Sequence, residues 1–214
     1  MKTPAAAVLA AFIFSSALPA TIWTEIGDAG LLPGTAQRTA GAGPLTEIRG
    51  LINHTLDADM FQIFITGGGA FSASTIGGTG LDTQLFLFSA PGFGVYANDD
   101  AVSFPYQSQL PAGHPLTPAQ PGFYYLVVTP WDLDPTSALG LIFPTFPYEG
   151  VFGPTGPGGS LPISGYSGFG DAGPYTVFLT GAEFAVVPEP ATLLLVSAGL
   201  GWLVTRGRDL RIRR

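Results

Sequence analysis

The sequence contains no cysteine, little positive charge and only two histidines, and each scarcity removes a class of function. Without cysteine there is no disulfide framework, no thiolate nucleophile and no Cys-ligated zinc or iron. Between residues 21 and 187 the only basic side chains are Arg38 and Arg49, against 13 acids, which is a net charge of −11. Because phosphate contacts need Lys or Arg, nucleic acid and anionic lipid are poor partners, whereas cations and neutral polymers are compatible with this charge.

The two histidines, His54 and His114, both lie in loop-like sequence. Nucleophilic catalysis needs a base within hydrogen-bond reach of the nucleophile, and neither histidine accompanies a G-x-S-x-G or H-E-x-x-H motif. We therefore expect exposed loop histidines in a protein that is not an enzyme. A pair of carboxylates that hydrolyses sugars stays open as an alternative, because a sequence does not reveal the separation between two acids.

The C-terminal residues 187–214 combine three parts in order. An apolar run over residues 191–205 is shorter than the roughly 20 residues that a membrane helix needs, so it suits a transient anchor better than a permanent one. The arginines in residues 206–214 would stay on the cytoplasmic side of the membrane. The motif ahead of the run is Val187, Pro188, Glu189 and Pro190, and the arginines behind it are Arg206, Arg208, Arg211, Arg213 and Arg214.

This three-part string resembles the PEP-CTERM sorting signal of Gram-negative bacteria. The resemblance implies that an exosortase recognises the segment and removes it. An ordinary C-terminal anchor that is never cut is the alternative.

The first 20 residues have the pattern of a secretory signal peptide, with Lys2 ahead of an apolar stretch and small residues near Ala20. With the C-terminal segment, this pattern predicts an exported domain over residues 21–186. The secretion machinery and an exosortase are then its expected partners, with transient attachment to the inner membrane. The expected location is extracellular or at the cell surface.

The exported region has the composition of an all-β protein. The whole chain has 30 glycines and 20 prolines, most of them in this region, and they suppress long helices while short apolar runs survive between turn residues. We predict an antiparallel β-sandwich between about Gly43 and Phe184, with helices only in the signal peptide and the C-terminal apolar run. Residues 144–174, rich in Gly, Pro and Ser, are expected to form a long surface loop. The predicted strands are residues 45–52, 60–66, 70–75, 84–88, 94–97, 123–129, 139–143 and 175–180.

Four stretches in order, residues 57–61, 81–100, 121–129 and 173–181, resemble the bacterial pre-peptidase C-terminal domain. The shared pattern is an acid-x-acid pair leading into a strand, a strand followed by Asn-Asp-Asp, a Pro-Gly-aromatic-Tyr strand and a Gly-Pro-Tyr-Thr strand. The resemblance implies a small sandwich with jelly-roll character and a non-catalytic role. Some members of that family bind calcium.

Acidic residues are the best candidates for a ligand site. Asp57 and Asp59 alternate in strand-like sequence, so their side chains share one face. The family resemblance implies that Glu25 and Asp28 join them in a calcium site. Calcium takes six to eight oxygen ligands in flexible geometry, so a loop with three successive oxygen-bearing side chains is a second candidate for part of a calcium site. The alternative is an ordinary turn, because Asp and Asn are common turn formers. That loop holds Asn98, Asp99 and Asp100.

Aromatic residues in the 144–174 stretch are too numerous for all of them to be core, and they could pack on the sheet or stack on sugar rings. We therefore expect a non-catalytic surface or extracellular-matrix protein that associates with exopolysaccharide. A carbohydrate-active or peptidase-associated secreted enzyme component is the alternative.

Overall fold

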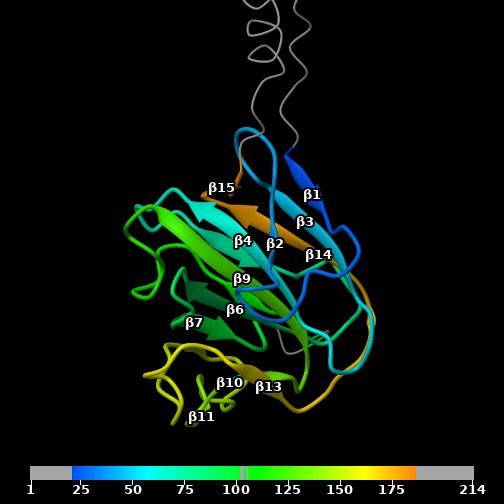
Figure 1. Cartoon of the computed structure of the whole chain (residues 1–214), viewed down its shortest axis with the longest axis vertical. Coiled ribbons are helices and arrows are strands. Elements are labelled where there is room, and N and C mark those ends of the chain that lie inside the picture. The colour runs from blue at the N-terminus through cyan, green and yellow to red at the C-terminus, as the bar shows by residue number, and fades with distance from the viewer. Residues whose placement is uncertain (1–20, 102–103, 105, 187–214) are drawn as a thin grey trace, which may run out of the picture.

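The described part of the chain consists of strands, turns and loops. The computed structural model describes residues 21–101, 104 and 106–186, and Figure 1 shows no helix among them. The predicted all-β class is therefore confirmed for this region, which also lacks any helix long and apolar enough to cross a membrane. The helices predicted for residues 1–20 and 191–205, the sorting motif and the C-terminal arginines lie outside the described residues.

A seven-stranded sheet is the centre of the fold. Its longest members are paired antiparallel, with seven aligned residue pairs in each of the two central ladders. The strands, in spatial order, are β12 (Val151–Phe152), β7 (Gly94–Asn98), β6 (Thr83–Ser89), β9 (Gly122–Pro130), β4 (Asp59–Ile65) and β15 (Ala182–Phe184), with β2 (Gln37–Arg38) added to β4.

Two smaller sheets accompany it. The five-stranded sheet has the order β1 (Ile22–Thr24), β3 (Glu47–Ile52), β14 (Gly173–Thr180), β5 (Ser72–Ser74) and β8 (Gln109–Leu110). The three-stranded sheet has the order β11 (Gly140–Leu141), β10 (Asp134–Ser137) and β13 (Gly165–Ser167), and lies at the lower end of the molecule in Figure 1.

The five-stranded and seven-stranded sheets share one hydrophobic core. Alternate residues of β4, β6 and β9 point into it, and β3 and β14 supply the opposite wall. This arrangement of two layers is consistent with a β-sandwich. The main contributors are Phe61, Ile63, Leu85, Leu87, Leu126 and Val128 from one sheet, and Ile48, Ile52, Val177 and Leu179 from the other.

The other face of the seven-stranded sheet is also buried, against a second core. The intervening residues of β4, β6 and β9 contribute Met60, Phe86, Phe88 and Val127. The chain after β9 covers them with Leu133, Ile142, Phe143 and Ile163. Because both faces are covered, β6 is buried along Thr83–Phe88, and its residues 85–88 form a continuous apolar run instead of an alternating one.

The predicted strands all coincide with observed ones, and the corrections concern what lies between them. The sheets are mixed instead of purely antiparallel, because β1 pairs parallel to β3 and β2 pairs parallel to β4. The fold begins before Gly43, since Trp23 and Ala29 pack in the shared core. The 144–174 stretch is not only a surface loop: it contains β12, β13 and the start of β14, and Ile163 closes the second core.

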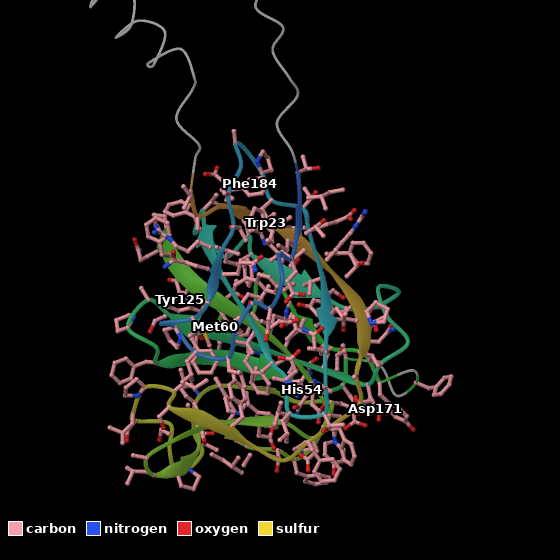
Figure 2. The ribbon with its side chains drawn as sticks, turned by 45° about the vertical axis from the view of Figure 1, so that its right-hand side comes forward. Trp23, His54, Met60, Tyr125, Asp171 and Phe184 are labelled. Atoms are coloured by element: carbon pink, nitrogen blue, oxygen red, sulfur yellow. The ribbon has the colours of Figure 1, made fainter. Side chains whose placement is uncertain are left out.

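Both ends of the described chain lie at the same end of the molecule. The Thr21 carbonyl oxygen accepts the Thr46 amide, and Ala182 hydrogen-bonds to Leu45, so β1 and β15 emerge close together. In Figure 2, Trp23 and Phe184 lie near this upper end, whereas His54 and Asp171 lie lower in the molecule. The described domain therefore has an end where the chain enters and leaves, and an opposite end of loops.

Candidate functional site

Three of the predicted calcium ligands converge in the structure. Glu25 follows β1, Asp28 lies in the next turn and Asp59 is the first residue of β4. Carboxylate oxygens from these three residues lie within 4.8 Å of one another. The fourth predicted ligand, Asp57, lies between β3 and β4 and is not one of the three residues whose oxygens converge, although its charge adds to the effect of burial in raising the pKa of Asp59. We call these four residues the N-terminal cluster.

Glu25 ties its segment to β3. One oxygen, Oε1, accepts the Ala29 amide at 2.8 Å, and the other, Oε2, accepts the Leu51 amide at 2.8 Å. Asp28 Oδ1 accepts the Gly30 amide at 3.3 Å. These bonds orient the two carboxylates from one side of the N-terminal cluster.

Asp57 and Asp59 approach from the protein interior and are fully buried. Asp57 Oδ2 accepts the Asn53 amide at 2.6 Å, and Asp59 Oδ2 accepts the hydroxyl of Tyr175 at 2.6 Å. The second oxygen of each, Oδ1, is buried without a hydrogen-bond partner in the described part of the chain. A buried carboxylate oxygen without a partner is costly, so these two atoms call for a ligand or a proton.

The absence of a side chain at Gly50 lets Tyr175 reach Asp59. Gly50 lies opposite Tyr175 in the β3–β14 ladder. A Cβ atom at position 50 would collide with the Tyr175 hydroxyl and come within 2.9 Å of Glu25 Oε2. Without a side chain at position 50, the Tyr175 hydroxyl and Glu25 Oε2 can both occupy the space beside this strand.

In the part of the chain that the structure describes, no basic side chain forms an ion pair with these carboxylates. Arg49 binds Glu47 at 2.7 Å, and Arg38 donates to Gln62 at 2.9 Å. Burial, followed by the charges of Glu25, Asp57 and Asp28, raises the pKa of Asp59 from 3.8 to about 8, although the bond from Tyr175 opposes the shift. Burial also raises the pKa of Glu25.

The N-terminal cluster fits a calcium ion. Two oxygens that bind one Ca²⁺ at 2.3–2.6 Å lie at most about 5.2 Å apart, which includes the observed spacing. All the side-chain donors are oxygens, as a hard cation requires. A surface hollow of about 310 Å³ reaches Glu25 from solvent, and Arg49, which binds Glu47, also lines it.

The predicted Asn98–Asp100 group is divided by the structure. Asn98 holds the loop, because its Oδ1 accepts the Gln109 amide at 2.8 Å and its Nδ2 donates to the carbonyl oxygens of Asp100 and Gly150. Asp99 and Asp100 instead meet Asp82, with carboxylate oxygens of all three within 4.8 Å of one another. We call Asp82, Asp99 and Asp100 the groove cluster.

Sequence reasoning missed Asp82. It directly precedes β6, and the antiparallel pairing of Leu85 with Asn98 brings it to the same end of the hairpin as Asp99 and Asp100. Asp82 could have been predicted by pairing the two neighbouring predicted strands as a hairpin. In an antiparallel hairpin, an acid just before the first strand lies beside acids just after the second strand.

An open groove of about 440 Å³ adjoins this cluster. Three half-exposed aromatic side chains line it, and they come from three separate loops. The groove lies near the end of β9 at Pro130. The start of β9, about 27 Å away at the usual rise per residue, is separated from β15 only by β4. The lining residues are Asp82, Asp100, Tyr106, Trp131, Tyr148 and Glu149.

The two histidines occupy ordinary loop positions. His54, labelled in Figure 2, is exposed and its Nδ1 accepts the Leu56 amide at 3.3 Å. His114 is half-buried, its Nδ1 accepts the Leu116 amide at 3.2 Å, and its ring stacks on Tyr96 with centroids 6.4 Å apart. In each histidine, Nδ1 therefore accepts a hydrogen bond from the backbone amide two residues later in the same turn.

Comparisons of the chain with protein-family models, with curated proteins and with solved structures gave no match.

In calcium-free buffer we expect the melting temperature of the full-length chain to fall as pH rises from about 5 to about 8. Burial raises the pKa of Asp59 and of Asp99 from 3.8 to about 8, so between these values the folded state holds protons that the unfolded state has released. Stability then falls with rising pH. Thermal melts across this range measure the slope.

The variant Asp59→Asn should have a shallower slope, because an amide does not titrate. The charged groups and tyrosines around Asp59 remain in that variant, namely Glu25, Asp28, Asp57, Tyr166 and Tyr175. A melting temperature that stays constant or rises over the same range would contradict the prediction.

Proposed function

We propose that this chain is an exported, non-catalytic surface or matrix protein whose β-domain is stabilised by calcium and associates with exopolysaccharide. The observation that carries the proposal is the pair of fully buried carboxylates, Asp57 and Asp59, each with a partnerless oxygen. The finer fold proposal is a jelly-roll-like sandwich, supported by the core that the two larger sheets share.

Calcium at the N-terminal cluster would join two parts of the fold. Glu25 and Asp28 belong to the segment after β1, whereas Asp57 and Asp59 belong to the connection from β3 into β4. A Ca²⁺ ion would supply the positive charge that Arg38 and Arg49 do not bring here. Its role is structural, because binding to the folded state alone raises stability.

Polysaccharide association is supported by the groove. Trp131, Tyr106 and Tyr148 are 45%, 43% and 41% exposed, so their rings are available to a ligand. Aromatic faces with nearby polar groups are typical of ligand sites, and a volume near 440 Å³ suits a small ligand or a short stretch of polymer. The net charge of residues 21–187 favours a neutral polymer.

Export and sorting are supported by the sequence alone. We propose a signal peptide over residues 1–20 and a PEP-CTERM segment over residues 187–214, the latter held in the inner membrane by a short helix until an exosortase removes it. The β-domain would then remain extracellular or at the cell surface.

We expect millimolar calcium to raise the melting temperature of the full-length chain relative to EDTA. At one hundred times Kd the stabilisation is about 2.7 kcal/mol, or about 5–10 °C for a domain of this size. Magnesium should give little shift, because it demands a tighter octahedral shell. The double variant Asp57→Asn with Asp59→Asn should lose most of the calcium shift.

A matched control removes two exposed acids outside the cluster, by Asp171→Asn with Glu183→Gln, and should keep that shift. Equal melting temperatures in calcium and in EDTA for the unmodified protein would refute the structural role of calcium.

We expect the full-length chain to be retarded in a native gel that contains exopolysaccharide from the native host. Replacing Trp131 and Tyr148 by Ala should reduce the retardation at least several-fold, because the aromatic faces of the groove are lost. Phe178→Ala, which removes a ring of similar exposure from β14, is the control and should behave like the unmodified protein. Release of reducing sugar during the assay would favour the alternative, a carbohydrate-active enzyme.

We expect the protein recovered from its native host to lack the C-terminal segment, as measured by intact-mass analysis. Replacing Pro188 and Pro190 by Ala should leave the segment attached, since the motif that the exosortase recognises is lost. Arg214 on most molecules of the unmodified protein would overturn the processing proposal.

A further inference from the structure

We propose that Asp82, Asp99 and Asp100 form a second calcium site, on the floor of the aromatic groove. This site is separate from the N-terminal cluster and goes beyond the proposed function, since a cation here would lie at the surface that meets the ligand. The inference does not depend on the identity of any polysaccharide.

The three carboxylates have the spacing of a shared cation. Their oxygens lie within 4.8 Å of one another, inside the limit of about 5.2 Å for two oxygens on one Ca²⁺. They come from two neighbouring strands of one sheet, Asp82 ahead of β6 and the other two after β7, so the β-hairpin fixes their positions. A rigid backbone of this kind preorganises the site.

The unsatisfied atoms of the cluster provide an independent sign of a ligand. Asp100 is only 8% exposed, and its Oδ1 is buried without a hydrogen-bond partner among the described residues. The Oδ1 atoms of Asp82 and Asp99 are in the same state. Ordinary turn-forming aspartates use their oxygens to accept nearby amides, which these three atoms do not do.

The surroundings add negative charge instead of neutralising it. Burial is the main cause of the raised pKa of all three acids, and neighbouring acids raise each pKa further. Those neighbours include Asp134, Glu149 and Asp171, and the two arginines of the described region bond elsewhere. A divalent cation satisfies the partnerless oxygens and the surplus charge together.

The backbone connects the aromatic rim to the same acids. The Trp131 amide donates to the Asp82 carbonyl oxygen at 3.1 Å, and the Asp100 amide donates to the Tyr148 carbonyl oxygen at 2.9 Å. The Thr83 amide donates to the Tyr106 carbonyl oxygen at 3.2 Å. A cation that orders the acids would therefore also order the three rings.

The groove site differs from the N-terminal cluster in its access. Asp82 and Asp100 line the open groove, and three carboxylates fill only part of a shell of six to eight oxygens. The remaining coordination positions would face the groove, where water or the oxygens of a ligand could take them.

Calcium titration of the full-length chain by isothermal calorimetry tests the proposal without any polysaccharide. We expect two calcium ions per chain, and one in the double variant Asp99→Asn with Asp100→Asn. The variant Asp57→Asn with Asp59→Asn should retain the groove site, so failure of the proposed structural calcium and failure of this inference give different patterns. If the double variant does not fold, the single variant Asp82→Asn is tested in its place, and we expect it to weaken calcium binding at the groove site at least tenfold.

Sensitised emission from terbium is a second readout, because it appears only when the ion itself is bound close to an aromatic ring. In the Asp57→Asn with Asp59→Asn background, which removes the Tb³⁺ site close to Trp23, Tb³⁺ bound in the groove should emit when tryptophan is excited. Trp131→Phe in that background should reduce the emission several-fold while the number of calcium ions bound is unchanged. Asp171→Asn, which removes a nearby exposed acid outside the cluster, is the control for charge and should keep the site. Unchanged calcium stoichiometry and affinity in both the Asp99/Asp100 variant and Asp82→Asn would overturn the inference.

Discussion

Strands β4, β6 and β9 are apolar on both faces, so water must be excluded from both sides of the sheet that they form. One side packs on the five-stranded sheet, and the other is covered by the chain that follows β9. This requirement explains why the 144–174 stretch is structured: its residue Ile163 closes the second core together with Ile142 and Phe143, which directly precede the stretch. Two of the groove residues, Trp131 and Tyr148, belong to the chain after β9 that supplies this cover.

Acidic residues lie at the ends of strands of the seven-stranded sheet, next to the apolar cores. Asp59 begins β4, Asp82 precedes β6, and Asp99 follows β7. Each has an oxygen that is buried and has no partner in the described region, and few cations are at hand. Protons neutralise such carboxylates at low pH, and the proposed calcium ions would do so at higher pH.

The sequence was informative wherever a single strand carried the pattern. Every predicted strand was found, and the predicted meeting of Glu25, Asp28 and Asp59 was found as geometry, although calcium binding there stays a prediction. What the sequence could not show depended on pairing between distant segments. The parallel partners of β3 and β4 are only two or three residues long, and Asp82 joins its cluster only through hairpin register. The role of Gly50 likewise depends on which residue lies opposite it.

Because β1 and β15 emerge at one end, the described domain is held from a single side whichever end of the chain is attached to something else. The groove lies at the far end of β9. A molecule immobilised through either terminus would therefore present the same aromatic and acidic surface outward.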